Sequence, residues 1–397
     1  MRDLIRKMKR ISLVFGTRPE AIKMAPIILG LQKHPDIQPH VCVSGQHREM
    51  LDQVLQSFEI APDEDLSLMQ PDQQLGELTS KAILAIDNYL RQYKPDLLLV
   101  QGDTTTTFCA SMAAFYNRIP LGHVEAGLRS CNKSSPYPEE INRLLTTRLA
   151  DYHFVPTNQS RANLIKEDVL PDKIFVTGNT VIDALQIAIS KVRTNPPRIA
   201  GLPDQVADRR SLQPLVLITG HRREDFGEGL RDICSAIARL AERFPQTIFV
   251  FPVHPNPNVR DPVFRFLSNK ENVFLIEPLG YLPFVALMDR STLILTDSGG
   301  IQEEAPSLGK PVLVTRETTE RVEGLEAGIA KLVGTNSDVI VEAITSLLTN
   351  QSAYETMSRA INPYGDGYAS KRIIDMCAHL LKTQSHEDPG PNREERL

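Results

Sequence analysis

The stretch that says most about the fold is residues 11–20, which read ISLVFGTRPE. The first five residues predict a short buried strand, and Gly16 and Pro19 then mark the change to a helix. The same order recurs at residues 215–224, LVLITGHRRE, where another apolar strand runs into Gly220. A strand that passes through a glycine loop into a helix is typical of parallel α/β sheets. The two similar openings therefore predict two Rossmann-like halves.

Short apolar strands alternate with longer helical patterns along both halves. In the first half the predicted strands are residues 11–15, 40–44, 96–100, 120–124 and 152–155, with helices at 19–32, 48–57 and 107–117. In the second half the predicted strands are residues 215–219, 247–251, 273–276, 293–296 and 311–314. Regular alternation of this kind favours an α/β class with two doubly wound domains.

A break in the pattern separates the halves. Residues 195–197, Asn-Pro-Pro, and the charged residues 208–210 predict a linker and surface loop. The predicted organisation is an N-terminal lobe at 10–190, a C-terminal lobe at 211–365, a helix at 366–383 that returns to the N-terminal lobe, and a disordered polar tail at 384–397.

Composition narrows the class of protein. The 397 residues are 41% hydrophobic and 23% charged, with a net charge of -5, so no bulk basic character favours nucleic acid or an anionic membrane. The sequence has no apolar run of the roughly 18–20 residues that a bilayer span needs. Five scattered cysteines without a C-x-x-C pair favour a reduced, cytoplasmic protein without a metal or disulfide framework.

Three carboxylates in the first half lie where predicted strands end or in a stiff loop. They are Asp103, Glu125 and Glu139, the last following Pro136 and Pro138. Carboxylates gathered at one edge of a sheet supply an acid and a base at neutral pH. For Asp103 the alternative is helix N-capping, because Gly-Asp-Thr before a helix is good capping chemistry. His221 is a candidate proton-transfer group or phosphate donor.

A second group of residues suits phosphate. Arg18, Lys23, Arg222 and Arg321 are candidates because guanidinium and ammonium groups bind phosphate oxygens, although Lys23 fits a solvated surface cation better. Residues 298–300, Ser-Gly-Gly, follow an apolar strand and open a helix, which suits close approach of an anion. Glu304 lies within reach of a ribose hydroxyl. A glycine turn needed only for packing is an equally good reading of residues 298–300.

Other chemistries leave no trace in the sequence. It contains no G-x-x-x-x-G-K-[ST], no G-x-G-x-x-G after the first strand, no G-x-S-x-G and no H-E-x-x-H. These absences weaken kinase, dehydrogenase, esterase and zinc-protease hypotheses. His254, between Val253 and Pro255, fits a structural histidine better than a catalytic one.

Taken in order, the motifs resemble those of the non-hydrolysing UDP-N-acetylglucosamine 2-epimerases. The matching segments are residues 16–20, 46–51, 102–107, 123–129, 138–140, 177–180, 220–224 and 297–304. The resemblance implies two lobes of the GT-B type facing a central cleft, a homodimer, and no nicotinamide or other cofactor. It also implies interconversion of UDP-GlcNAc and UDP-ManNAc through loss and re-addition of UDP, which supplies envelope polysaccharides.

The resemblance carries over to particular positions. It implies catalytic roles for Asp103, Glu125, Glu139 and His221. It implies UDP contacts for Arg18, Lys23, Phe284, Ser298, Gly299, Gly300, Glu304 and Arg321. Some relatives bind UDP-GlcNAc in a second, regulatory pocket, and Gln46, Arg222 and His254 match parts of it. The segment Gln73-Gln74 lacks an arginine of that pocket, so regulation does not follow directly.

Three rival functions remain. A hydrolysing epimerase would release UDP and free ManNAc, whereas the set of Asp103, Glu125, Glu139 and His221 follows the non-hydrolysing pattern. A GT-B glycosyltransferase would share the nucleotide lobe but needs an acceptor groove that the sequence does not reveal. A non-catalytic nucleotide-sugar sensor could dispense with the carboxylates, all of which are present.

Overall fold

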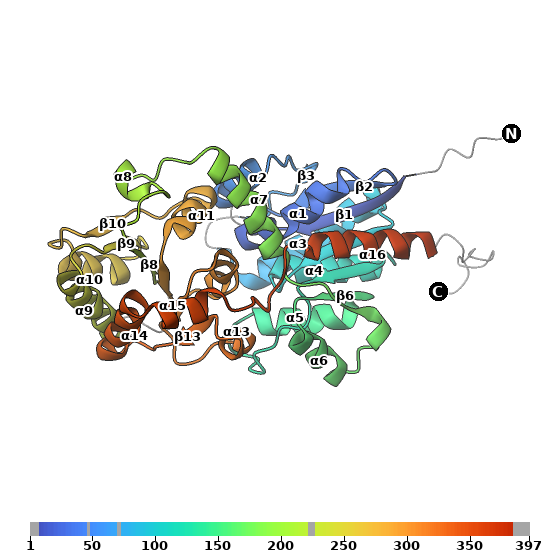
Figure 1. The fold of residues 1–397 in the computed structure, drawn as a ribbon. Coiled ribbons are helices and arrows are strands. Elements are labelled where there is room, and N and C mark those ends of the chain that lie inside the picture. Colours follow the sequence, from blue (N-terminus) through green and yellow to red (C-terminus); the bar gives the residue numbers. More distant parts are fainter. Residues whose placement is uncertain (1–7, 46–47, 70–72, 221–226, 384–397) are drawn as a thin grey trace, which may run out of the picture. The chain divides into compact units, whose positions relative to one another are not determined.

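The computed structural model describes residues 8–45, 48–69, 73–220 and 227–383 (Figure 1). They form two compact units. Unit 1 contains the described residues up to Ala184 and from Gly365 onward, and unit 2 runs from Leu185 to Tyr364. The chain first crosses between the units inside helix α7, Thr180–Thr194, ahead of the loop-rich residues 195–214.

Unit 1 is built on a seven-stranded sheet with the order β3-β2-β1-β4-β5-β6-β7, and every strand pair is parallel. Its strands are β1 Lys9–Phe15, β2 Ile37–Val43, β3 Glu64–Asp65, β4 Leu97–Gln101, β5 Leu121–Val124, β6 Tyr152–Val155 and β7 Ile174–Val176. Strands β1, β4 and β5 are almost wholly buried, as expected for a parallel sheet with helices on both faces.

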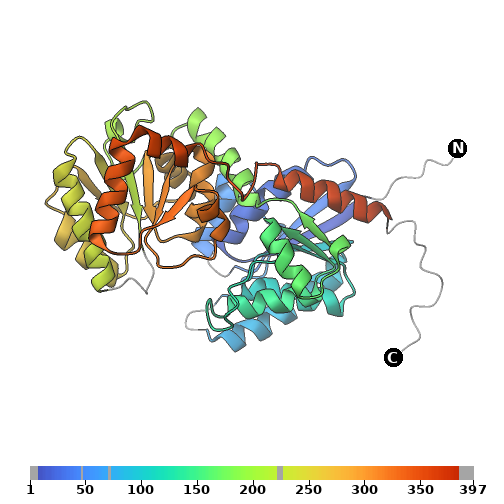
Figure 2. The ribbon, with the colours of Figure 1, turned by 60° about the horizontal axis from the view of Figure 1, so that its bottom comes forward.

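Helices follow the strands of unit 1 in alternation. They are α1 Arg18–Leu31, α2 Arg48–Ser57, α3 Leu75–Tyr93, α4 Thr105–Tyr116, α5 Glu139–Leu149, α6 Asn158–Lys166 and the first part of α7. The last helix, α16 Ala369–Thr383, packs against α1, as Figures 1 and 2 both show. Gly30 of α1 permits this approach, because a Cβ there would collide with the Ile374 side chain.

Unit 2 repeats the same architecture with six parallel strands in the order β10-β9-β8-β11-β12-β13. Its strands are β8 Leu215–Thr219, β9 Ile248–Pro252, β10 Val273–Ile276, β11 Leu293–Thr296, β12 Val312–Val314 and β13 Ala330–Leu332. Its helices are the rest of α7, α8 Asp204–Ala207, α9 Glu228–Arg243, α10 Pro257–Leu267, α11 Tyr281–Arg290, α12 Gly299–Glu304, α13 Val322–Glu326, α14 Ser337–Thr349 and α15 Gln351–Ser358.

These two sheets confirm the predicted α/β class. Each has one point where the chain reverses its direction across the sheet, between β1 and β4 in unit 1 and between β8 and β11 in unit 2. In open parallel sheets, ligands bind beyond the carboxyl ends of the strands at such points. None of the helices in the described ranges combines the length and apolar character that a membrane crossing needs.

Candidate active site

The loop between β1 and α1, at the carboxyl end of the unit 1 sheet, is held in place by a buried carboxylate. Glu20, 2% exposed, accepts hydrogen bonds from the backbone amides of Gly16 at 3.0 Å and Thr17 at 2.7 Å, which closes a capping box at the start of α1. It also accepts hydrogen bonds from the hydroxyls of Thr104 at 2.8 Å and Thr107 at 3.1 Å. Burial raises the pKa of Glu20, partly offset by these bonds. Glu20 thus ties the start of α1, where Arg18 lies, to the turn after β4.

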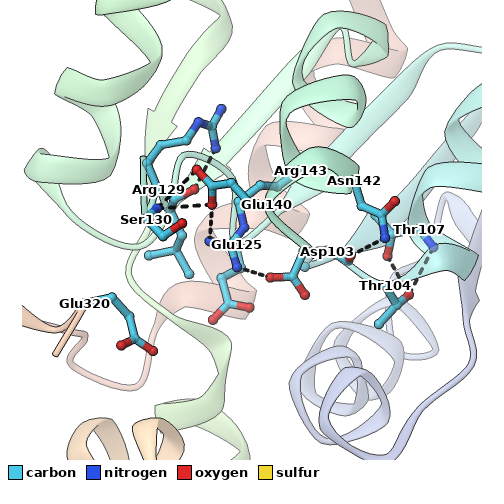
Figure 3. A network of polar contacts seen from close by, with 12 residues as sticks. Asp103, Thr104, Thr107, Glu125, Arg129, Ser130, Glu140, Asn142, Arg143 and Glu320 are labelled. Atoms are coloured by element: carbon cyan, nitrogen blue, oxygen red, sulfur yellow. Dashed lines mark hydrogen bonds and ion pairs between the residues drawn. The ribbon is translucent and has the colours of Figure 1, made fainter. Parts of the chain in front are cut away.

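The turn after β4 places Asp103 beside a positive charge. Gly102 has a φ of 74°, a left-handed conformation that favours glycine. The N-cap of α4 is Thr104, whose hydroxyl accepts a hydrogen bond from the Thr107 amide at 3.1 Å, so the capping alternative for Asp103 is wrong. The carboxylate of Asp103 is instead ion-paired with the guanidinium of Arg143 (Figure 3).

Glu125, directly after β5, is surrounded by donors. Its carboxylate is 2.5 Å from the ammonium of Lys23 and 2.8 Å from the amide nitrogen of Asn179, and it also accepts a hydrogen bond from Gln101. Its φ of 62° is uncommon for a residue other than glycine. Gly102 lies close by, since a Cβ there would be 3.7 Å from Glu125 Oε2. Lys23 is therefore not a solvated surface cation.

Glu139 is the first residue of α5 and is half-buried. Its Oε2 is buried and accepts no hydrogen bond from the residues that the structure describes. A buried acceptor without a donor is uncommon in a folded protein and calls for an explanation such as a proton or ligand that joins it. This oxygen is thus a candidate contact for a bound molecule.

In unit 2 the predicted phosphate turn lies at the end of β11. The hydroxyl of Thr296 accepts a hydrogen bond from the Ser298 amide at 3.0 Å and is 2.6 Å from the hydroxyl of Thr219 at the end of β8. The Arg321 side chain lies over this turn, because a Cβ on Gly299 would be only 2.8 Å from Arg321 Cζ.

Carboxylates fix the Arg321 guanidinium in that place. Its Nε donates to Glu303 at 2.9 Å, and a second nitrogen pairs with Glu320. Charge from Arg321 and Arg316, together with hydrogen bonds, lowers the pKa of Glu320 to about 2 against the opposing effect of its burial. The turn at residues 298–300 and Arg321 therefore form one group of potential anion-binding atoms within unit 2.

The other predicted positions fall into two groups. His221, Arg222 and Gln46 lie outside the described residues. Phe284 is half-buried on α11, Glu304 is half-buried at the end of α12, and His254 is exposed, with Nδ1 accepting a hydrogen bond from the Asn256 amide at 3.2 Å.

Three side chains of this edge of unit 1 were not assigned any role from the sequence: Gln101, Asn179 and Arg143. Gln101 is a polar end to an apolar strand, which is a weak signal on its own. Arg143 lies on α5 and is only 9% exposed.

Comparison with solved structures supports the class of protein that this architecture defines. A glycotransferase of kitacinnamycin shares the fold with a TM-score of 0.62 at 12% identity, over 94% of this chain and all of the other. Two parallel α/β units, each with a switch point in its sheet, therefore define a fold of the GT-B type.

Closer similarities identify the family. The family model described as UDP-N-acetylglucosamine 2-epimerase matches residues 30–378. The UDP-N-acetylglucosamine 2-epimerase of Yersinia pestis is 56% identical over 365 residues, which cover 92% of this chain and 97% of that protein. The crystal structure of the Neisseria meningitidis UDP-GlcNAc 2-epimerase bound to UDP-GlcNAc matches with a TM-score of 0.84 and 52% identity, over 93% of this chain and all of that one. The chain belongs to the UDP-N-acetylglucosamine 2-epimerase family of isomerases.

Proposed function

We propose that this enzyme interconverts UDP-GlcNAc and UDP-ManNAc by the non-hydrolysing route. A base removes the C2 proton while the C1–O bond breaks and UDP leaves with the bonding electrons, forming 2-acetamidoglucal. Protonation of C2 on the opposite face and return of UDP to C1 then complete the inversion. The observation that supports this most is the set of three carboxylates in unit 1, in a chain more than half identical to the Yersinia enzyme.

The environments of the three carboxylates suit different tasks in this path. Glu125 accepts hydrogen bonds from Lys23, Gln101 and Asn179, which suits an ionised carboxylate. We assign the C2 proton to Glu125 and Asp103, and contacts to the sugar to Glu139, whose Oε2 lacks a donor in the described residues. Geometry that fixes a base beside the reacting carbon contributes most to removal of so weakly acidic a proton.

The departing diphosphate gains negative charge, and we assign its stabilisation to Arg18, His221 and the start of the helix at Ser298. The proposed UDP contacts as a whole are Arg18, Lys23, Phe284, Ser298, Gly299, Gly300, Glu304 and Arg321. Preorganised donors stabilise such charge more than mobile ones do. Arg321 is preorganised in this sense, because its hydrogen bond to Glu303 fixes the guanidinium.

The resemblance also supports a homodimer, a cytoplasmic location and a role in making precursors of envelope polysaccharide. It supports a regulatory UDP-GlcNAc pocket less strongly. Gln46, Arg222 and His254 match that pocket, but the segment at Gln73-Gln74 departs from it. Hyperbolic kinetics with UDP-ManNAc turned over in the absence of UDP-GlcNAc would exclude this regulation.

Proton NMR of UDP-GlcNAc with the enzyme in heavy water tests the proposal. We expect UDP-ManNAc to appear with deuterium at C2 in both sugars. Accumulation of free ManNAc and UDP would identify a hydrolysing epimerase instead. Consumption of UDP-sugar only after an acceptor is added would identify a glycosyltransferase, and bound but unchanged UDP-GlcNAc without deuterium would identify a sensor.

A further inference from the structure

We propose that Arg143 is a positioning residue that holds the carboxylate of Asp103 in the orientation required for the reaction at C2. This inference rests on the proposed function and adds to it a residue of α5 that is not among the expected site residues. Arg143 touches neither the substrate nor the reacting atoms in this proposal, and it acts through Asp103.

The contacts of Arg143 run in two directions. One guanidinium nitrogen pairs with Asp103 Oδ2, and the other donates to Glu140 Oε2 at 2.9 Å (Figure 3). The neighbouring Asn142 donates from its side-chain nitrogen to the backbone carbonyl of Asp103 at 3.0 Å. Helix α5 therefore holds Asp103 by both its main chain and its side chain.

Glu140 in turn is anchored to the segment that follows Glu125. It is 2% exposed and accepts hydrogen bonds from the backbone amides of Ser130, at 3.1 Å and 3.2 Å to its two oxygens, and of Cys131 at 3.1 Å. Helix α5 therefore contacts the surroundings of all three proposed acids. It begins at Glu139, pairs with Asp103 through Arg143, and binds through Glu140 the segment that follows Glu125. Among the described residues, Arg143 is the only side chain that links this framework to the Asp103 carboxylate by a hydrogen bond or ion pair.

The exposed fraction of the side chains falls along this chain of contacts, from Asp103 through Arg143 to Glu140. The side chain of Asp103 is 28% exposed, that of Arg143 is 11% exposed and that of Glu140 is 2% exposed. A buried ion pair is weak evidence for stabilisation, because desolvation offsets the attraction. Here the solvent-facing partner is the proposed acid, and the buried partners are those that fix it. A planar guanidinium can bridge two carboxylates in fixed geometry, whereas a lysine ammonium is a point charge.

The experiment compares the wild-type enzyme with Arg143→Lys, Arg143→Ala, Asp103→Asn and the double variant Asp103→Asn/Arg143→Ala. We expect Arg143→Ala to lower kcat about 100-fold, as small misplacements of a catalytic group do, with UDP affinity within a factor of about three of wild type. Arg143→Lys should recover only part of kcat. Guanidinium chloride at millimolar concentration should raise kcat of Arg143→Ala by about tenfold or more, since it refills the site next to Asp103.

The double variant separates positioning from general stability. If Arg143 acts through Asp103, the double variant is no slower than Asp103→Asn alone, because residues that act as a unit are not additive. Arg148→Lys is the control on α5, since exposed Arg148 donates to the Glu167 carbonyl rather than to Asp103. It should keep wild-type kcat.

Two results would overturn the inference: kcat of Arg143→Ala within a factor of about three of wild type, or additive losses in the double variant. Loss of UDP affinity and melting temperature in parallel with kcat, without guanidinium rescue, would overturn it too and assign Arg143 a structural role. If the wild type itself fails to exchange deuterium at C2, the proposed function fails and not merely this inference.

Discussion

Glu125 is held in a conformation that few side chains adopt. Its positive φ falls at the end of β5, where the chain leaves the sheet. Non-glycine residues persist in that region only when the surroundings over-determine them, and such strain is concentrated at functional sites. Lys23, Gln101 and Asn179 bind the Glu125 carboxylate and so help to keep the residue in this conformation.

Replacing the carboxylate tests the role of that residue. Glu125→Gln should lower kcat by roughly 10²–10⁴, the usual contribution of a general base, while UDP affinity changes little. Steady-state kinetics and deuterium exchange at C2 measure the loss, and calorimetry measures UDP binding. The exposed Glu228→Gln on α9 is the control and should behave as wild type. Unchanged exchange in Glu125→Gln would show that another group takes the proton.

Two histidines of the unit 1 sheet, His123 on β5 and His153 on β6, are buried and neutral. Desolvation is the main cause that lowers the pKa of His123 to about 3 and that of His153 to about 4. They are cross-strand neighbours on β5 and β6, and the Nε2 of His123 is 2.7 Å from the Gly102 carbonyl. Unfolding exposes both rings to water, where their pKa returns to 6.5.

That difference predicts how stability depends on pH. Because the folded pKa of His153 is depressed, its stabilising contribution is present above pH 6.5 and is lost as pH falls from 6.5 towards 4. Each such site contributes a slope of about 1.4 kcal/mol per pH unit within its window. His153→Gln should therefore lose less stability than wild type between pH 6.5 and 4.5, measured by urea unfolding at several pH values. Parallel profiles would contradict the assignment.

Among the elements, the start of α16 is held by a buried acid of α7. Asp183 of α7 is 4% exposed and accepts hydrogen bonds from the Ser370 amide at 2.8 Å, the Ser370 hydroxyl at 2.6 Å and the Ala369 amide at 3.2 Å. These donors lie at the start of α16, where unpaired amides favour a negative charge. Burial raises the pKa of Asp183, and the hydrogen bonds oppose that rise.

Removing this acid should weaken the attachment of α16 without affecting chemistry directly. Asp183→Ala should lower the free energy of unfolding by about 1–3 kcal/mol, since it leaves buried donors without an acceptor. Denaturant unfolding measures this, with Asp375→Ala on the exposed side of α16 as the control. A change below 0.5 kcal/mol, equal to the control, would mean that the apolar packing of α16 on α1 suffices.

At the scale of the whole molecule, the second crossing between the units is the peptide bond between Tyr364 and Gly365. Within unit 2, the Tyr364 hydroxyl accepts a hydrogen bond from the Gly324 amide at 3.0 Å and donates one to the Arg321 carbonyl at 3.1 Å. Within unit 1, Gly365 lies against the backbone of Asn179, whose side chain donates to Glu125. Tyr364 thus contacts the backbone of Arg321, the proposed UDP-binding arginine. Its neighbour Gly365 contacts the backbone of Asn179, which binds the proposed base.

The hydroxyl of Tyr364 should therefore matter for UDP. We expect Tyr364→Phe to weaken UDP binding roughly 3- to 10-fold, because the lost hydrogen bonds, each about 1 kcal/mol, free the backbone at Arg321. Isothermal calorimetry with UDP measures the change. Tyr354→Phe is matched, since the Tyr354 hydroxyl donates to the Thr292 carbonyl at 3.2 Å in the same unit. Equal UDP affinity in the two variants would remove Tyr364 from this role.

Local sequence patterns determined the α/β class, the positions of most strands and the loops at their carboxyl ends. Burial on both faces makes those strands continuous apolar runs, which a sequence displays directly. Strands β3, β7 and β13 were not predicted, because they have only two or three residues and depend on a neighbouring strand for their definition. The family also followed from the sequence, because its motifs occur in order along the chain.

Only the tertiary structure decides which side chains contact the three carboxylates of unit 1. Thr104 rather than Asp103 caps α4, Lys23 pairs with Glu125 across 102 positions of sequence, and Arg143 reaches Asp103 across 40. Local propensity describes a residue and its near neighbours in the chain. An ion pair between distant residues depends on how the parallel strands bring their ends together, so only the folded sheet defines it.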